Sequence, residues 1–224
     1  MIIMGESNRL VIFGNTGAAK IAFHYFTTDS KYDVVAFTVD SQYIDEPTFQ
    51  GLPVVAFEDI SKIYSPDDTW LFVAMGYSKM NKIREEKYML CRDLGYRLAS
   101  YVSSKCNFLS ENQPGDNCMI LEDNTVQPYV EIGDNVVLWS GNHIGHDVVI
   151  GSHSFISSHV VISGNTVIGE RCFLGVNSTV RDSIELGDST LVGAGAIIMS
   201  STEQDSVWLP PKSTKIRKKS SDLL

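Results

Sequence analysis

Aliphatic residues recur at every sixth position over a long stretch of this 224-residue chain. A period of six fits neither a helix of 3.6 residues per turn nor an alternating strand. It predicts a chain that turns a corner every six residues, so that three sides make one coil. The series runs without a miss through Ile120, Val126, Ile132, Leu138, Ile144, Ile150, Ile156, Ile162, Ile168, Leu174, Val180, Leu186, Val192 and Ile198.

The predicted architecture is therefore a triangular parallel β-helix. Each aliphatic side chain points into a narrow prism, a small residue packs beside it, and Gly or Asn takes the corner backbone conformation that other residues resist. Equivalent residues of successive coils stack about 4.8 Å apart. Residues 120–200 then make between four and five coils. The spacing alone leaves the hand of the coil open.

The residues before the repeat follow a different pattern. A buried-strand run at 9–14 leads into the glycine turn 15–20 and the helix-like segment 21–26. A second strand at 32–40 ends on Asp40, roughly 25 residues after the turn, the spacing at which an acidic side chain meets a ribose or base in nucleotide-binding βαβ units. Candidate substrate-binding residues here are Gly14, Asn15, Thr16, Gly17 and Asp40.

This turn leaves two interpretations open. Gly14 and Gly17 lack the third glycine of a full dinucleotide fingerprint. The turn therefore fits phosphate or nucleotide binding, and it also fits a tight connection between strand and helix. Asp40 could equally serve as a turn or cap residue.

Further elements complete the first half. Strands are predicted at 51–56, 70–76 and 96–101, and a helix at 81–94. Residues 1–103 are thus predicted to form a doubly wound, Rossmann-like α/β domain. Residues 104–200 form the β-helix, and residues 201–224 form a C-terminal tail.

Composition excludes several classes of protein. The chain has 18 Lys and Arg against 27 Asp and Glu, and its net charge of −9 disfavours nucleic acid or an anionic membrane as the main partner. The four cysteines contain no CxxC pair, which indicates reduced thiols. The start of the sequence lacks a signal peptide, and no apolar run reaches membrane-spanning length. We expect a soluble, cytoplasmic protein.

The chain resembles the NeuD-type sugar acyltransferases of the hexapeptide-repeat superfamily, over nearly its whole length. In the first half, the segment 73–76 with Asn81 and Arg84 is similar to the family's strand and helix start before the coils. In the repeat, the matching segments are Gly145-His146-Asp147-Val148-Val149-Ile150-Gly151, Ser163-Gly164-Asn165 with Ile168-Gly169, and Cys172-Phe173-Leu174-Gly175-Val176-Asn177-Ser178.

The resemblance implies a left-handed coil, a homotrimer, and acetyl-CoA in a groove between neighbouring coils. It assigns His146 as the general base, Asp147 as its supporting acid and the Gly164 amide as the oxyanion donor, roles that an imidazole and a backbone N–H can fill near neutral pH. The implied CoA-binding residues are Gly164, Asn165, Gly175, Gly193 and Ala194, and Gly76 and His143 join the substrate-binding residues.

Two positions depart from the family pattern. Family members often carry a second histidine nine residues after the base, near the thioester carbonyl, where this chain has Phe155. Either the acyl group therefore sits differently in this chain, or its pocket is more apolar. The family also tends to end its coils with Gly-x-Pro-Ala-Lys, where this chain has Leu209-Pro210-Pro211-Lys212. The contacts to the adenosine end of CoA must differ accordingly.

The histidines raise an alternative. His143, His146, His153 and His159 fall within 17 residues, and coils of this kind also carry the zinc site of γ-class carbonic anhydrases, where three neutral imidazoles hold the metal. His153 and His159 lie on adjacent sides of one coil, which argues against shared ligation within one chain. His143, His153 and His159 are otherwise interface or surface groups, or contacts to substrate.

We therefore predict an acetyl-CoA-dependent N-acetyltransferase that acts on a nucleotide-linked amino sugar for a surface glycan, without a resident metal. The alternatives are a sugar O-acetyltransferase, a zinc hydro-lyase and a trimeric scaffold without catalytic activity.

Overall fold

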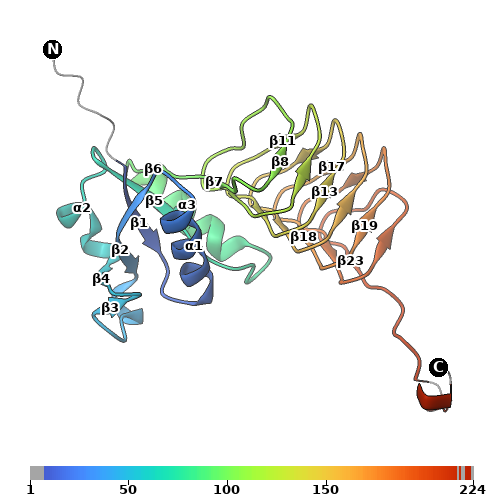
Figure 1. Cartoon of the computed structure of the whole chain (residues 1–224), viewed down its shortest axis with the longest axis horizontal. Coiled ribbons are helices and arrows are strands. Elements are labelled where there is room, and N and C mark those ends of the chain that lie inside the picture. Colours follow the sequence, from blue (N-terminus) through green and yellow to red (C-terminus); the bar gives the residue numbers. More distant parts are fainter. Residues whose placement is uncertain (1–7, 216, 218–219, 223–224) are drawn as a thin grey trace.

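The computed structural model shows an α/β domain beside a three-sided β-helix (Figure 1). It describes residues 8–215, 217 and 220–222. Two predictions fall partly outside the described residues. They are the absence of a signal peptide, which concerns residues 1–7, and the C-terminal tail, which includes 216, 218–219 and 223–224.

The α/β domain is built on one six-stranded sheet of order β3-β4-β2-β1-β5-β6, in which only the β3–β4 pair is antiparallel. Helix α1 packs on one face of the sheet, and α2 and α3 pack on the other. The doubly wound prediction is confirmed. The elements are β1 (Arg9–Phe13), α1 (Gly17–Thr28), β2 (Asp33–Val39), η1 (Ser41–Tyr43), β3 (Thr48–Phe49), β4 (Leu52–Ala56), η2 (Phe57–Asp59), α2 (Ile60–Ile63), β5 (Thr69–Val73), α3 (Lys82–Asp93) and β6 (Arg97–Leu98).

The β-helix has three parallel faces, which we number 1 to 3. Face 1 holds β7 (Tyr101–Val102), β9 (Met119–Ile120), β12 (Val137–Leu138), β15 (Phe155–Ile156), β18 (Phe173–Leu174), β21 (Leu191–Val192) and β23 (Val207–Trp208). Face 2 holds β8 (Asn107–Phe108), β10 (Thr125–Val126), β13 (His143–Ile144), β16 (Val161–Ile162), β19 (Thr179–Val180) and β22 (Ile197–Ile198). Face 3 holds β11 (Glu131–Ile132), β14 (Val149–Ile150), β17 (Val167–Ile168) and β20 (Glu185–Leu186). A last short helix, η3 (Ser220–Asp222), lies in the tail.

The aliphatic series fills the prism as predicted. Every one of its members is buried, the most accessible being Ile132 at 6% exposure. The small residues beside the series are buried as well, among them Ser154, Thr166 and Cys172. The hydrophobic stabilisation of the β-helix therefore comes from one continuous column of apolar side chains.

The corners differ from the prediction in their residue types. A left-handed backbone recurs every six residues from Asn117 to Gly195, three positions after each inward aliphatic from Ile120 to Val192. Asn117, Asn135, Asn165 and Asn177 occupy several of these sites as expected. The same conformation is also taken by Asp, His, Arg, Ser and Tyr, including Asp123, Tyr129, Asp147, His153, His159, Arg171, Ser183 and Ser189. The stacking of successive coils imposes the conformation on these residues, at a cost that packing offsets.

The glycines that follow the aliphatic residues serve a different purpose. Gly151 does not have a left-handed backbone, yet a Cβ added there would lie 2.6 Å from the backbone carbon of Gly169 in the next coil. Gly145 and Gly175 are equally close to the coil above them. These positions therefore need glycine for close approach of backbones.

The boundary between the two regions falls inside a segment that the sequence presents as one strand. Residues 96–101 divide into β6 of the α/β sheet and β7 of face 1. Val102 lies 18 residues before Ile120, so the six-residue period already applies there. Strand β23 also extends face 1 into the predicted tail.

Replacing Gly151 tests this close-approach role. We expect Gly151→Ala to lower the free energy of unfolding in urea by about 2 kcal/mol, because the added methyl group overpacks the stacked coils. Ser157→Ala is the matched control, since Ser157 occupies the same repeat position with a Cβ already accommodated. Equal stability of both variants would show that the coils separate without cost.

Candidate active site

The α/β domain is fixed to the β-helix through a buried arginine. Arg84 of α3 is only 1% exposed, and its Nη2 donates to the carbonyl oxygens of His153 at 2.7 Å and Asn135 at 3.2 Å. Nearby, Asn81 Nδ2 donates to the carbonyl oxygens of Arg171 and Cys172. Burial lowers the pKa of Arg84 to about 10, a value still above neutral pH, and the guanidinium therefore stays charged. Backbone carbonyl oxygens take the place of water around it.

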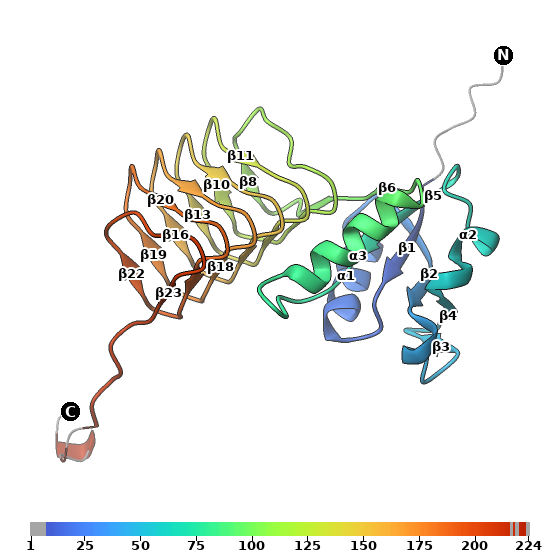
Figure 2. The same ribbon diagram turned by 180° about the vertical axis from the view of Figure 1, so that it is seen from behind.

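These contacts place the domain on face 1. The residues that hold Arg84 lie at the corner between faces 3 and 1. At the corner between faces 1 and 2, the Tyr25 hydroxyl of α1 donates to Glu122 Oε2 at a distance of 2.6 Å. The outward side chains Met119, Val137 and Phe155 of face 1 pack in the same apolar cluster as α1. The domain thus spans face 1 from one corner to the other, and α3 lies along this junction (Figure 2).

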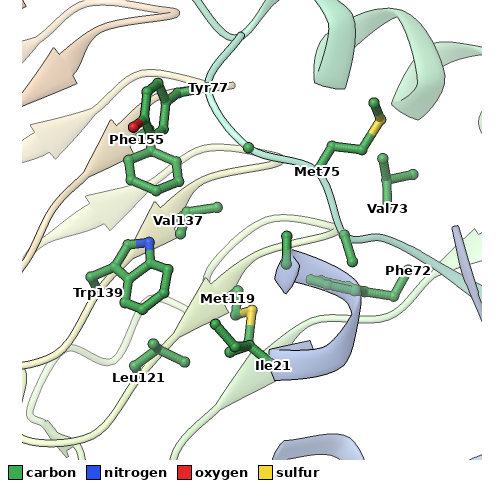
Figure 3. Close-up of a pocket in the computed structure, with 13 residues that line it drawn as sticks. Ile21, Phe72, Val73, Met75, Tyr77, Met119, Leu121, Val137, Trp139 and Phe155 are labelled. Atoms are coloured by element: carbon green, nitrogen blue, oxygen red, sulfur yellow. The ribbon is translucent and has the colours of Figure 1, made fainter. Parts of the chain in front are cut away.

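An apolar cavity of about 210 Å³ lies at this junction (Figure 3). Its lining from the α/β domain includes Ile21, Met75 and Tyr77, and its lining from face 1 includes Met119, Leu121, Val137, Trp139 and Phe155. Phe155, which departs from the family pattern, stacks on Phe173 with centroids 5.8 Å apart and meets the Tyr77 ring at 5.1 Å. The position at which the family pattern has a histidine is therefore apolar in this chain and lies under the α/β domain.

A second cavity, of about 890 Å³, opens at the carboxyl edge of the α/β sheet. Its lining contains Gly14, Asn15 and Thr16 from the glycine turn, Asp40 after β2, and Gly76 after β5. Gly17 is the first residue of α1, whose first N–H groups have no intrahelical acceptors. The structure thus brings Gly14, Asn15, Thr16, Asp40 and Gly76 around one cavity, which we call the nucleotide cavity after its predicted ligand. Gly17 and His143, also predicted to bind substrate, are not part of its lining.

Lys87 is a residue of this cavity that the sequence analysis missed. Its Nζ lies 2.8 Å from both carboxylate oxygens of Asp40. Ile83, Glu86 and Lys87 share one face of α3 and all line the cavity. The sequence could have indicated these residues, because they are spaced i, i+3 and i+4 on a predicted helix that follows a strand end and therefore lie on one helix face.

His146 occupies the corner between faces 2 and 3. Its Nδ1 lies 2.8 Å from Asp147 Oδ2, and both side chains are about half exposed. Asp147 is the left-handed corner residue, with φ of 56°. The backbone N–H of His146 donates to Gln127 Oε1 of the preceding coil. The imidazole is therefore oriented on a rigid corner with Nε2 free of Asp147.

Gly164 lies one coil further along this corner, beside the imidazole. A Cβ added at Gly164 would lie 2.7 Å from His146 Nε2, so glycine leaves room for the ring. Within the described part of the chain, the Gly164 N–H donates to no protein acceptor. The three predicted catalytic residues, His146, Asp147 and Gly164, therefore come together.

The predicted CoA-binding residues separate into two groups. Gly164 and Asn165 lie at the corner between faces 2 and 3, with His146. Gly175, Gly193 and Ala194 lie at the corner between faces 1 and 2, where Gly175 stacks directly under Ala194. One chain does not bring the two groups together.

The other histidines have separate surroundings. His153 is buried beside α3: its Nδ1 lies 2.9 Å from Asn135 Nδ2, and its ring meets Tyr88 edge-on. His143 is exposed on face 2, and His159 is exposed at the corner between faces 1 and 2. Among the described residues, no three His, Cys, Asp or Glu side chains are grouped as they would be around a metal ion. His153 therefore lies at the junction between the α/β domain and the β-helix of one chain.

Comparisons with protein families identify the repeat. Residues 129–164 match the model "Bacterial transferase hexapeptide (six repeats)", and residues 165–200 match "Hexapeptide repeat of succinyl-transferase". No curated protein matches the chain significantly.

Solved structures match the whole architecture. The acetyltransferase domain of PglB from Neisseria gonorrhoeae FA1090, in complex with acetyl coenzyme A, has a TM-score of 0.81 at 21% identity, covering 91% of this chain and 97% of that one. PerB from Caulobacter crescentus, in complex with CoA and GDP-perosamine, has a TM-score of 0.79 at 23% identity, covering 92% and 95%. WeeI from Acinetobacter baumannii AYE has a TM-score of 0.75 at 19% identity, covering 88% and 94%.

These matches confirm the predicted fold: a Rossmann-like α/β domain followed by a left-handed parallel β-helix of hexapeptide repeats. They confirm the stated resemblance at the level of the fold and the repeat. In the described part of the chain, no helix has the length and apolar character needed to span a membrane.

The buried position of His153 predicts a dependence of stability on pH. Burial lowers its pKa, an effect that Glu85 opposes and Arg84 and Arg171 reinforce. A lowered pKa in the folded state gives stability that is present above the unfolded pKa of about 6.5 and is lost as the pH falls below it. The free energy of unfolding should fall between about pH 7.5 and 5.5, and we expect a smaller fall in the His153→Asn variant than in the wild type. Asn is chosen because it tolerates the left-handed backbone at this position.

His159→Asn is the matched control, because His159 has the same backbone conformation and is exposed. Urea unfolding of all three proteins at both pH values gives the comparison. Parallel losses in the three proteins would contradict the role of His153.

Proposed function

We propose that this hexapeptide-repeat protein transfers the acetyl group of acetyl-CoA to the amino group of a nucleotide-linked sugar. The observation that carries the proposal is the His146–Asp147 pair beside the Gly164 amide, on an exposed corner of the β-helix. The turn at Gly14–Thr16 with Asp40, lining a cavity large enough for a nucleotide, supports a nucleotide-linked acceptor.

The geometry suits a general base. With Nδ1–H donated to Asp147, the neutral imidazole keeps the Nε2 lone pair as proton acceptor. The amine nitrogen of the acceptor attacks the thioester carbonyl carbon while His146 Nε2 takes a proton from that nitrogen. The Gly164 N–H donates to the oxyanion that develops on the carbonyl oxygen. Collapse of the intermediate breaks the carbon–sulfur bond, and the thiolate of CoA receives a proton. The amide and free CoA are the products.

The site requires a second chain. In a three-sided prism, the corner between faces 2 and 3 lies opposite face 1, which the α/β domain of the same chain covers. A sugar held by that domain therefore faces away from its own His146. A homotrimer of parallel prisms would bring the His146 corner of one chain to face 1 of the next, and would join the two groups of predicted CoA-binding residues across one groove.

An amine acceptor is favoured over a hydroxyl by the solved relatives. PerB from Caulobacter crescentus was solved with GDP-perosamine and CoA. A second structure, 23% identical to this chain, is of a mutant perosamine N-acetyltransferase from the same organism with the same two ligands. The acidic chain, with a net charge of −9, fits a small-molecule acceptor and no nucleic-acid partner. A cytoplasmic location, where acetyl-CoA would be available, remains part of the proposal.

Removing the base tests the proposal. We expect His146→Ala to lower kcat by roughly 10² to 10⁴, the range for a lost general base, with little change in CoA affinity or fold. The half-exposed ring leaves no cavity in the prism. Asp147→Asn should lower kcat less, because an amide can still orient the imidazole. Thiol release with a panel of nucleotide-linked amino sugars and acetyl-CoA measures the rates.

Two results would contradict the assignment. Near-normal turnover of His146→Ala would show that the acceptor arrives deprotonated or that another group is the base. Stoichiometric zinc in the purified protein, lost together with activity in His146→Ala, would favour the hydro-lyase alternative.

A further inference from the structure

The nucleotide cavity contains a largely buried ion pair, in which Asp40 is a proposed substrate-binding residue and Lys87 has no role so far. Lys87 Nζ lies 2.8 Å from both oxygens of Asp40, and the two side chains are only 14% and 18% exposed. Shielded pairs of this kind are geometrically restrictive, and removing one partner leaves an uncompensated charge. The pair therefore has a defined orientation at the carboxyl end of β2.

The surroundings of Lys87 leave its ammonium group little capacity for a ligand. An ammonium has three N–H donors, and two of them meet the oxygens of Asp40. Nζ also lies 5.6 Å from the centre of the Phe13 ring and 6.0 Å from that of Phe57, so aromatic faces occupy its remaining side. Lys87 is thus directed at Asp40 and is poorly placed to bind a diphosphate itself.

Asp40 keeps acceptor capacity after this contact. Each carboxylate oxygen has two lone pairs, and Lys87 uses one on each. A carboxylate accepts hydrogen bonds from hydroxyl or N–H groups and repels phosphate. Its natural partners on a nucleotide are therefore ribose hydroxyls and base N–H groups.

The segment that carries Asp40 is restrained at further points. Asn15 Nδ2, in the glycine turn, donates to the carbonyl oxygen of Tyr43 at 2.9 Å. The Ser41 N–H and hydroxyl donate to Glu58 at 3.1 to 3.2 Å. Helix η1 is thus tied to the glycine turn and to Glu58 of η2, and the Asp40 side chain just before it is held by Lys87.

Charge also favours such a pairing. The cavity is lined by the carboxylates of Asp40, Asp45 and Glu86 and by two lysines, Lys79 and Lys87. Lys87 therefore compensates the charge of the one carboxylate among these three that it contacts, Asp40.

We propose that Lys87 is a positioning residue that holds the Asp40 carboxylate to accept hydrogen bonds from the nucleoside part of a nucleoside diphosphate. The inference rests on the proposed function, because it takes this cavity as the nucleotide site. It assigns to Lys87 an action through Asp40, and none on the phosphates.

Calorimetry with defined probes tests the inference. UDP, GDP and dTDP are titrated into the full-length protein, and the tightest binder is compared with its parent nucleoside. We expect Lys87→Met to weaken both probes by the same factor, about tenfold or more, because Asp40 loses its orientation and charge partner. Lys87→Arg, which can pair with both carboxylate oxygens, should stay within about threefold of the wild type.

A double-variant cycle separates action through Asp40 from general damage. In an Asp40→Asn background, Lys87→Met should add no further loss of affinity, because the interaction that it removes is already absent. Lys62→Met is the control for loss of a lysine charge, since Lys62 pairs with Asp59 on the exposed surface, away from the cavity lining. If Lys87→Met does not fold, Lys87→Gln takes its place, with a smaller but still measurable weakening of both probes.

Two outcomes would overturn the inference alone. Loss of diphosphate affinity with unchanged nucleoside affinity would show that Lys87 binds the phosphates. Independent, additive losses in the double variant would show that Lys87 does not act through Asp40. Failure of the wild type to bind any of the three diphosphates would instead overturn the assignment of the cavity, and with it the nucleotide part of the proposed function.

Discussion

The left-handed backbone corner that recurs every six residues is the constraint on which the rest of this structure depends. It closes each coil into three faces, with residues of successive coils in register along the prism. Once face 1 is covered by the α/β domain, only one corner lies opposite that domain, and it carries His146 and Gly164. The division of the site between chains that we propose would follow from this coil geometry.

The attachment of the α/β domain depends on polar groups as much as on apolar burial. Arg84 replaces its hydration with carbonyl oxygens of the coil corners, and Asn81 does the same one coil further on. Arg84 Nη1 also lies 3.4 Å from the Gly76 carbonyl oxygen. Because Gly76 lines both the apolar cavity and the nucleotide cavity, the same arginine that joins the two regions supports the segment between the two cavities.

Much of the fold could be predicted from the sequence, because a periodic pattern reports backbone geometry directly. The aliphatic series predicted the prism, and the strand, glycine turn and acidic strand end predicted the α/β domain. Pairwise contacts between distant segments left no such pattern. Nothing local in the sequence shows that Arg84 would meet carbonyl oxygens of residues 135 and 153, or that Lys87 would reach Asp40. A single strand was predicted over residues 96–101, and the structure divides this run between two sheets.

The central claim, that a working site combines the nucleotide cavity of one chain with His146 of another, is tested most directly by complementation. One partner is His146→Ala, and the other is Gly76→Trp, which fills the nucleotide cavity at a glycine with open space around it. Each variant alone should be inactive. Trimers formed randomly from equal amounts of both should recover about a quarter of the wild-type sites, because a site works only where the two intact halves meet. Mixed trimers that are isolated and remain inactive would show that each site is built within one chain.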